Sequence, residues 1–476
     1  MEDILLERKT GVADRFFGIS QSHSSVKTEI LAGITTFITI AYILILNPQI
    51  LSDPYVIMGD PAMAGKIANG VFIGTCIGAF IGTALCALYA RVPFAQAPGM
   101  GLNAFFAYTV VLGMGYTYGQ ALVIVFISGI FFIVITAIGL REAIIRSIPD
   151  AVKTAITPGI GLFITIIGLK NAGIIISNPA TLVSLVDFSK WRSGADMVLI
   201  NGALVALIGL IIMGILHARR VKGSILLGIV AATLIGIPLG ITQLSNLDMN
   251  LGVKFRDFAE VSFLKMDFAG LFAGTNFVET LFTVTMLVIS FSLVNMFDSI
   301  GTLLGAARQS GMIDKNGEVI RMKQALMSDA VSTLAGAMVG TSTVTTVVES
   351  SAGIAEGGRT GLTSLVTAVM FLGAILFAPI VSIVPAAATA PALIFVGILM
   401  LGNIRDVDFS DMSNALPAFC TIVFMPFTYS IANGVAFGLI TYCLMNIMTG
   451  KRREVRALTF MISVVFVVRY AFMTLG

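Results

Sequence analysis

Four acidic residues lie inside long apolar stretches of the sequence, where a carboxylate is costly and usually functional. Asp298 and Glu349 have no Lys or Arg nearby in the sequence that could neutralise them. Because a low-dielectric surrounding penalises the charged form of a carboxyl group, these two acids are candidates to take up and release a proton. Asp329 suits either such a role or hydrogen bonds to neighbouring helices. Glu356 is interpreted as a helix-end group paired with Arg359.

Two apolar stretches are interrupted by residues that do not suit a helix. Residues 92–106 (VPFAQAPGMGLNAFF) contain two prolines and two glycines, and residues 340–358 open with a largely β-branched run. Extended backbone survives in a membrane only where protein buries it or where it lines a cavity, and two such stretches can pair with each other. Backbone N–H groups and side-chain acceptors would then meet at one site, which suits a flat, polar, mostly uncharged ligand.

The two interruptions occupy corresponding places in the two halves of the chain. Asn103 and Glu349 lie at nearly equal distances after Glu29 and Glu279, which open the first apolar run of each half. The Asn103 amide is either a ligand contact or a capping and packing group. Nearby phenylalanines, among them Phe105, could stack on a planar ring or simply pack.

The composition requires a membrane protein. Hydrophobic residues make up 57% of the 476 residues and charged residues 12%, with a mean hydropathy of +0.96, whereas a soluble domain has about 25% charged residues. The net charge of +3 gives no case for nucleic-acid binding. With two histidines and four cysteines that lack metal-ligand spacing, we expect no metal centre, no cofactor and no enzymatic triad.

Fourteen apolar runs predict membrane-spanning segments. They cover residues 29–47, 70–90, 95–113, 119–140, 150–172, 198–217, 223–241, 278–306, 324–340, 341–356, 362–384, 387–401, 414–428 and 431–448. Both termini are placed in the cytoplasm, because every connection that this orientation puts inside carries a Lys or Arg. Residues 459–475, interrupted by Arg469, are interpreted as an interfacial helix, with a fifteenth span as the alternative.

Seven spans in each half imply that the second half is inverted relative to the first, an arrangement typical of secondary transporters. The predicted divisions are a cytoplasmic segment 1–28, a first repeat 29–241, an extracytoplasmic loop 242–277, a second repeat 278–449, and a cytoplasmic or interfacial segment 450–476. Broken helices at matching places in such repeats mark the binding site.

Several motifs carry a family resemblance. They are residues 28–51 (TEILAGITTFITIAYILILNPQIL), 96–115 (QAPGMGLNAFFAYTVVLGMG), 159–175 (GIGLFITIIGLKNAGII), 297–305 (FDSIGTLLG), 339–364 and 388–400 (ATAPALIFVGILM). With these motifs the chain resembles the adenine/guanine/hypoxanthine permeases, the azaguanine-transporter-like branch of the nucleobase:cation symporters. The resemblance implies an all-α membrane protein with the uracil-permease fold. In that fold, segments 1–4 and 8–11 form a core domain, segments 5–7 and 12–14 form a gate domain, and segments 3 and 10 carry short β-strands.

The resemblance also implies site residues. Asp298 is expected to hold the nucleobase and to take part in proton coupling, Glu349 to bind ring nitrogens and share in the coupling, and Asp329 to support the core and the proton step. The third and tenth segments are expected to add the remaining contacts: Asn103, Ala104, Phe105, Thr346 and Ser350.

The leading interpretation is a secondary transporter in the cytoplasmic membrane that imports hypoxanthine, guanine or adenine by proton symport. Sodium coupling and a homodimer stay open. An anion carrier on the same fold would require a basic residue facing the site, whereas the candidates here are acidic. A channel would require a continuous polar face along several helices, and an enzyme would require a nucleophile–base pair.

Overall fold

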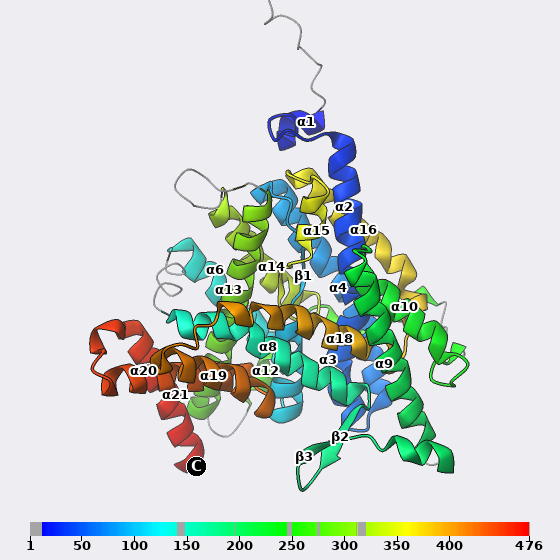
Figure 1. Ribbon diagram of the computed structural model, residues 1–476. Coiled ribbons are helices and arrows are strands. Elements are labelled where there is room, and N and C mark those ends of the chain that lie inside the picture. The colour runs from blue at the N-terminus through cyan, green and yellow to red at the C-terminus, as the bar shows by residue number, and fades with distance from the viewer. Residues whose placement is uncertain are drawn as a thin grey trace, which may run out of the picture.

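The chain folds into a mostly helical membrane protein. A computed structural model describes residues 12–139, 148–194, 196–244, 250–273, 277–310, 312 and 320–475 (Figure 1). Within these residues, nine helices are long and apolar enough to cross a membrane, and four further apolar helices are shorter. The expectation of a multi-pass membrane protein is confirmed.

The elements of the first half precede a connection with short helices of its own. The first half contains α1 (Val12–Phe17), α2 (Val26–Ile40), α3 (Ile43–Ile57), α4 (Pro61–Leu85), η1 (Cys86–Ala90), β1 (Gln96–Pro98), α5 (Met100–Ala104), η2 (Phe105–Gly113), α6 (Tyr118–Ala137), α8 (Asp150–Asn171), β2 (Ile175–Asn178), β3 (Leu182–Leu185), η3 (Phe188–Ser193), α9 (Met197–Ala218) and α10 (Ser224–Gly236). The connection contains α11 (Leu251–Asp257), η5 (Phe258–Ser262) and α12 (Phe268–Phe272).

The second half begins with the longest helix. Its elements are α13 (Phe277–Ser310), α14 (Met322–Met338), β4 (Val344–Thr346), α15 (Ser350–Ala355), α16 (Gly361–Gly373), η6 (Ala374–Phe377), α17 (Ala378–Val381), α18 (Ala386–Leu401), η7 (Gly402–Asp406), α19 (Met412–Phe427), α20 (Ile431–Met448), η8 (Arg452–Glu454) and α21 (Ala457–Leu475).

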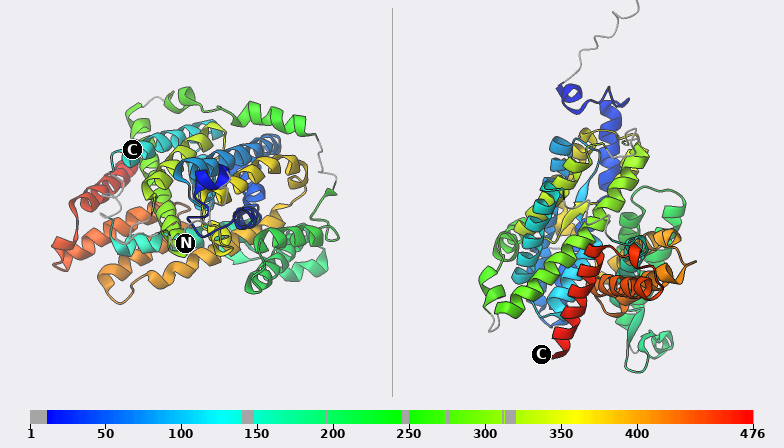
Figure 2. Two further views of the ribbon diagram at one scale, coloured as in Figure 1. Left: turned by 90° about the horizontal axis from the view of Figure 1, so that it is seen from above. Right: turned by 90° about the vertical axis from the view of Figure 1, so that its left-hand side faces the viewer.

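The helices pack into two groups. The first contains α2, α3, α4, α6, α13, α14, α15 and α16, and the second contains α8, α9, α10, α18, α19 and α20. Figure 2 shows the second group on one side of the first. The two groups meet where α5 and α13 contact α8, and the strand pair β1–β4 lies within the first group against α4 and α14 (Figure 1).

Several predicted boundaries are wrong by a helical turn or more. The run predicted to end at residue 47 continues as α3 to Ile57, because Pro48 and Pro54 are accommodated inside that helix. The run predicted to begin at residue 70 begins instead at Pro61. Asp60 caps this helix, accepting a hydrogen bond from the Met63 N–H, and the proline occupies a favourable first-turn position.

Two further features were absent from the sequence prediction. The predicted loop 242–277 contains α11, η5 and α12, and the connection after α8 forms the exposed hairpin β2–β3. The segment 459–475 lies within the single helix α21, which contacts α20. Figures 1 and 2 place α1 and the end of α21 at opposite ends of the molecule. The apolar stretch of α21, Ala457–Val468, is shorter than the nine candidate spans, so both the interfacial interpretation and the fifteenth span stay open.

Candidate functional site

The two interrupted segments meet as a short antiparallel ladder. Strand β1 pairs with β4 in a register that places Ala97 opposite Thr345. The ladder continues on both sides, because the Gly99 N–H donates to the Thr343 carbonyl at 3.2 Å and the Val347 N–H donates to the Ala95 carbonyl at 3.1 Å. Extended backbone is thereby satisfied inside the protein. The predicted strands in the third and tenth segments, and their pairing, are confirmed.

Asp329 anchors strand β4. One carboxylate oxygen accepts hydrogen bonds from the Thr346 N–H and the Thr345 hydroxyl, both at 2.9 Å. The other accepts from the Ser299 hydroxyl at 2.5 Å. The side chain is fully buried, so it fixes the strand to α13 and α14. These contacts give Asp329 a positioning role, and its predicted part in proton coupling stays a prediction.

Asp298 lies beside the ladder, and its carboxylate accepts no hydrogen bond from the described residues. It precedes Ser299 on α13 and is partly exposed. Its Oδ2 atom is 3.7 Å from the point that a Cβ on Gly99 would occupy, so it faces the end of β1. The carboxylate lies within electrostatic range of Asp329 and Glu349. Among the described residues no side chain or backbone group donates a hydrogen bond to it, which leaves its oxygens available to a ligand.

Glu349 occupies the point where β4 gives way to α15. It is partly exposed, and its Oε1 atom accepts a hydrogen bond from the Tyr42 hydroxyl at 2.6 Å. Tyr42 lies at the junction of α2 and α3 and is 1% exposed. Glu349 thus lies between β4 and α15, both of which contact α13, the helix that carries Asp298; the shared role of the two acids in substrate binding stays a prediction. The structure adds Tyr42, which no sequence signal near the acids indicated.

The Asn103 amide belongs to a different, buried polar network. Its Nδ2 donates to the Asn47 Oδ1 at 2.6 Å, and its Oδ1 accepts from the Ser342 hydroxyl. Asn47 in turn donates to the Thr75 hydroxyl at 2.7 Å and the Thr341 hydroxyl at 2.8 Å. Both asparagines are fully buried. This geometry supports the packing interpretation of Asn103 that the sequence left open.

The other predicted contacts divide between the ladder and the apolar core. The Ser350 hydroxyl accepts from the Ala95 N–H at 3.0 Å and donates to the Val347 carbonyl at 2.8 Å, so it ties the two broken segments together. The Thr346 hydroxyl accepts from the Gln96 amide at 3.4 Å. Both residues stabilise the frame around the acids.

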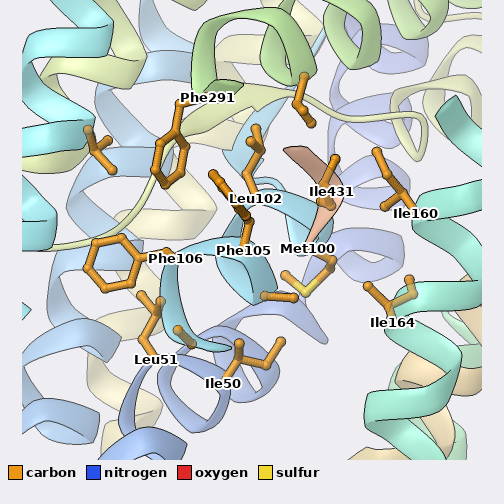
Figure 3. Close-up of a cluster of buried hydrophobic side chains, with 14 of the residues drawn as sticks. Ile50, Leu51, Met100, Leu102, Phe105, Phe106, Ile160, Ile164, Phe291 and Ile431 are labelled. Carbon is orange, nitrogen blue, oxygen red and sulfur yellow. The ribbon is translucent and has the colours of Figure 1, made fainter. Parts of the chain in front are cut away.

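Phe105 and Ala104 lie in the apolar core. The Phe105 ring is fully buried, with its centroid 4.8 Å from that of Phe291. Figure 3 shows it in a cluster of apolar side chains, with Phe291 on one side and Met100 and Ile431 on the other. Ala104 is 1% exposed. These contacts are apolar, so the structure does not place either side chain with the acid pair.

Metal binding has no support in the part of the chain that the structure describes. No group of three or more His, Cys, Asp or Glu side chains there could hold an ion. The four cysteines are buried and free.

Comparison with known proteins identifies the family. Residues 27–437 match the model of a permease family. The chain is 42% identical over 462 residues to a putative permease of Methanocaldococcus jannaschii, covering 97% of this chain and 98% of that protein. It is 38% identical to the adenine permease AdeQ of Escherichia coli, covering 98% and 97% of the two chains. It is 39% identical to the guanine/hypoxanthine permease PbuG of Bacillus subtilis, covering 96% and 99%.

Solved structures show the same fold at low sequence identity. The transmembrane domain of the cyanobacterial bicarbonate transporter BicA matches with a TM-score of 0.59 and 18% identity, covering 87% of this chain and 97% of that one. SLC26A9 matches with a TM-score of 0.60 and 11% identity, covering 92% of this chain and 69% of that one. The match along the chain assigns it to membrane transport and not to enzymatic catalysis. The chain belongs to the permease family, in which adenine and guanine/hypoxanthine permeases are its relatives.

Proposed function

We propose that the protein imports purine nucleobases, namely hypoxanthine, guanine or adenine, across the cytoplasmic membrane. The observation that carries the proposal is the pair of partly exposed carboxylates, Asp298 and Glu349, at the crossing of the two broken segments. Relatives that match almost the whole chain are named for adenine and for guanine/hypoxanthine.

The chemistry of the acids suits a purine. A purine ring presents N–H donors in its plane, and a carboxylate accepts such bonds with charge assistance. Asp298 has free acceptor capacity, and the Tyr42 hydroxyl holds one oxygen of Glu349 while the other stays available. Ring nitrogens would bind Glu349, and Asp298 would hold the base from the side of α13.

We further propose proton symport. Asp298, Glu349 and Asp329 form a cluster of acids in a low-dielectric surrounding, where like charges repel and protonation of one acid relieves the repulsion. A proton on Asp298 or Glu349 would lower the charge of the loaded site and permit it to move. Sodium is the alternative coupling ion.

The proposed architecture has fourteen segments in two inverted repeats. The antiparallel pairing of β1 with β4 supports it, because each strand belongs to the equivalent segment of its repeat. The first helix group corresponds to the core domain and the second to the gate domain. A homodimer is compatible with this arrangement.

Transport would require the contacts between core and gate to break. Two such contacts are the Asn171 amide donating to the Tyr108 hydroxyl at 3.1 Å and the Lys222–Glu356 ion pair at 2.5 Å. The predicted Glu356–Arg359 pair is wrong. Glu356 binds Lys222, and the Arg359 guanidinium donates to the carbonyls of Ile354 and Gly358.

The N-terminus is proposed to be cytoplasmic, from the Lys and Arg pattern. A cytoplasmic C-terminus follows if α21 is interfacial, and an external one follows if α21 crosses the membrane. A phosphatase or fluorescent-protein fusion at residue 476 distinguishes the two arrangements.

An anion carrier is the second candidate, because BicA is a bicarbonate transporter with the same fold. Asp298 and Glu349 argue against an anion carrier, because their two carboxylates would repel an anionic substrate. Uptake of labelled bicarbonate with no purine uptake would favour it.

The experiment is uptake of labelled hypoxanthine in cells that lack their own purine carriers. Wild-type protein should accumulate the label, with competition by adenine or guanine but not by uracil, and a protonophore should abolish accumulation. Asp298→Asn should fail to accumulate hypoxanthine while reaching the membrane at normal levels. Asp408→Asn, in an exposed connection, is the matched control. Normal uptake by Asp298→Asn would remove Asp298 from the mechanism. Sodium-dependent uptake that persists in the presence of the protonophore would identify sodium as the coupling ion in place of the proton.

A further inference from the structure

A second polar site lies at the end of the first helix group, away from the acid pair. It is a cavity of about 1000 Å³ between α1 with the residues that follow it, the end of η1, Arg321 before α14, and the 357–360 connection after α15. Figure 1 shows α1 at this end of the molecule, above α15 and α2. Five basic side chains line the cavity: Arg15, His23, Arg91, Arg321 and Arg359.

Three of the guanidinium groups are held in place but keep unused donors. The Arg91 guanidinium lies 4.4 Å from the centroid of the Phe16 ring. Arg321 uses one N–H to bind the Ala90 carbonyl at 3.2 Å. One terminal nitrogen of Arg359 binds the carbonyls of Ile354 and Gly358 at 2.6 and 2.8 Å. Since a guanidinium has five N–H donors in a rigid fork, each has donors left for a ligand.

Among the described residues, the cavity lining contains no Asp or Glu. The ion pairs found among those residues do not include Arg91, Arg321 or Arg359. Acids on the elements around the cavity have partners. Asp14 on α1 accepts hydrogen bonds from the Ser20 N–H and hydroxyl at 2.8 and 2.6 Å. Glu29, behind the wall, accepts hydrogen bonds from the Arg359 and Thr360 N–H groups, and Glu356 is paired with Lys222.

Three of the basic residues that line the cavity have a left-handed backbone conformation. His23, Arg91 and Arg321 have φ values of 52°, 54° and 59°, in the left-handed region that glycine occupies without strain and other residues rarely adopt. Glycine would suit each of these positions sterically. A basic side chain at all three, facing one cavity, is explained if the cavity binds an anion.

We propose that this cavity binds a phosphate group, carried either by a soluble phosphomonoester or by the headgroup of an anionic phospholipid. Arginine forks match the geometry of phosphate oxygens and bind them with charge-assisted hydrogen bonds. The Ser25, Thr28 and Thr360 hydroxyl groups in the lining can add further bonds. The cavity contacts both broken segments, because Arg91 leads into β1 and Arg359 follows α15. An anion there would join the distal ends of the two segments that frame the acids.

Binding is tested on the purified full-length protein in phosphatidylcholine nanodiscs, by calorimetric titration with inorganic phosphate and with a nucleoside 5′-monophosphate. Arg91→Gly and Arg321→Gly remove a cation where glycine fits the backbone, so folding should be retained. Each should weaken binding about tenfold or more, the value of one charge-assisted bond, and the double variant more. The control is Arg220→Gly, which removes an exposed arginine with the same left-handed backbone (φ 58°) outside the cavity.

The lipid source is tested in parallel. If the ligand is a headgroup, phosphatidylglycerol should copurify with the wild-type protein and with Arg220→Gly, and should be lost from the Arg91→Gly/Arg321→Gly double variant. Either soluble binding or lipid retention with this pattern supports the site. The proposal is overturned if neither occurs, or if the double variant binds as the wild type does. Because no step measures uptake, failure here is separate from failure of the proposed transport function.

Discussion

Substitution of Glu349 is the most direct test of the proposed binding site at Asp298 and Glu349. In Glu349→Gln the amide keeps a carbonyl oxygen, so the 2.6 Å bond from the Tyr42 hydroxyl can persist and the fold should survive. The charge is lost, and with it the charge-assisted part of each bond to a ring N–H. Hydrogen bonds to charged groups contribute about 1.5–3 kcal/mol, so purine affinity should fall by about tenfold to 150-fold.

The assay is hypoxanthine accumulation together with direct binding to purified protein. Glu349→Gln should bind weakly and should not accumulate substrate against a gradient, because the acid that would carry the proton is gone. Tyr42→Phe removes only the bond that orients Glu349. It should weaken binding by about tenfold while accumulation continues.

Glu356→Gln is the matched control, because Glu356 ends the same short helix that Glu349 begins. Its partner is Lys222, in the contact between the two helix groups. Loss of this ion pair should change transport turnover, whereas purine affinity should stay near the wild-type value. The reasoning is refuted if Glu349→Gln accumulates hypoxanthine normally, or if Glu356→Gln loses affinity to the same extent.

Three further predictions concern support, packing and charge. Asp329→Asn replaces a carboxylate oxygen by an NH2 group that faces the donors holding β4. The free energy of unfolding should therefore fall by about 1–3 kcal/mol. An unchanged melting temperature with lost proton coupling would instead make Asp329 a proton carrier. Gly101→Ala puts a methyl group 2.5 Å from the Ile160 Cγ2 atom on α8, so transport turnover should fall, and Ile160→Ala should restore it; a double variant as slow as the single one would contradict this contact. The hydrogen bond from Lys451 lowers the pKa of Asp411 from 3.8 to about 2. This depressed pKa stabilises the fold above about pH 4, and the stabilisation is lost as the pH falls toward 2. Lys451→Met should therefore lower the melting temperature at pH 7 and differ less from wild type near pH 3; an equal difference at both values would refute the coupling.

The broken segments could be predicted because their signals are local. The clustered prolines and glycines in 92–106 and the largely β-branched run after Gly340 disfavour a regular helix, and buried extended backbone must find a partner. The structure pairs these two segments, and Asp298 on α13 faces the end of β1 at Gly99. Of the two acids, only Glu349 could be placed at a break from its position in the sequence, because Asp298 lies in the continuous helix α13.

Residues that act through distant contacts could not be predicted in this way. Tyr42 binds Glu349 across 307 positions of sequence, and the break that presents it, between α2 and α3, has neither proline nor glycine at its centre. Asn103 was a reasonable candidate for a ligand contact by position, but its direction depends on Asn47, Thr341 and Ser342. Side-chain direction within a buried network depends on neighbours that hydropathy does not identify.

The ladder between β1 and β4 also has a consequence for synthesis and membrane insertion. Its two strands are separated by roughly 250 residues, which at about 5–20 residues per second takes on the order of 12 to 50 s to translate. During that interval the Ala95 N–H and C=O and the Gly99 N–H lack the partners that they have in the finished protein, namely Ser350, Val347 and Thr343, whereas Gln96 can already bind the Thr83 hydroxyl. The emerging first half must therefore be sheltered, by water, by the insertion machinery or by temporary contacts, until residues 343–347 arrive. A ribosome stalled before residue 343 should leave the Ala95 and Gly99 amides open to hydrogen exchange that the completed chain prevents.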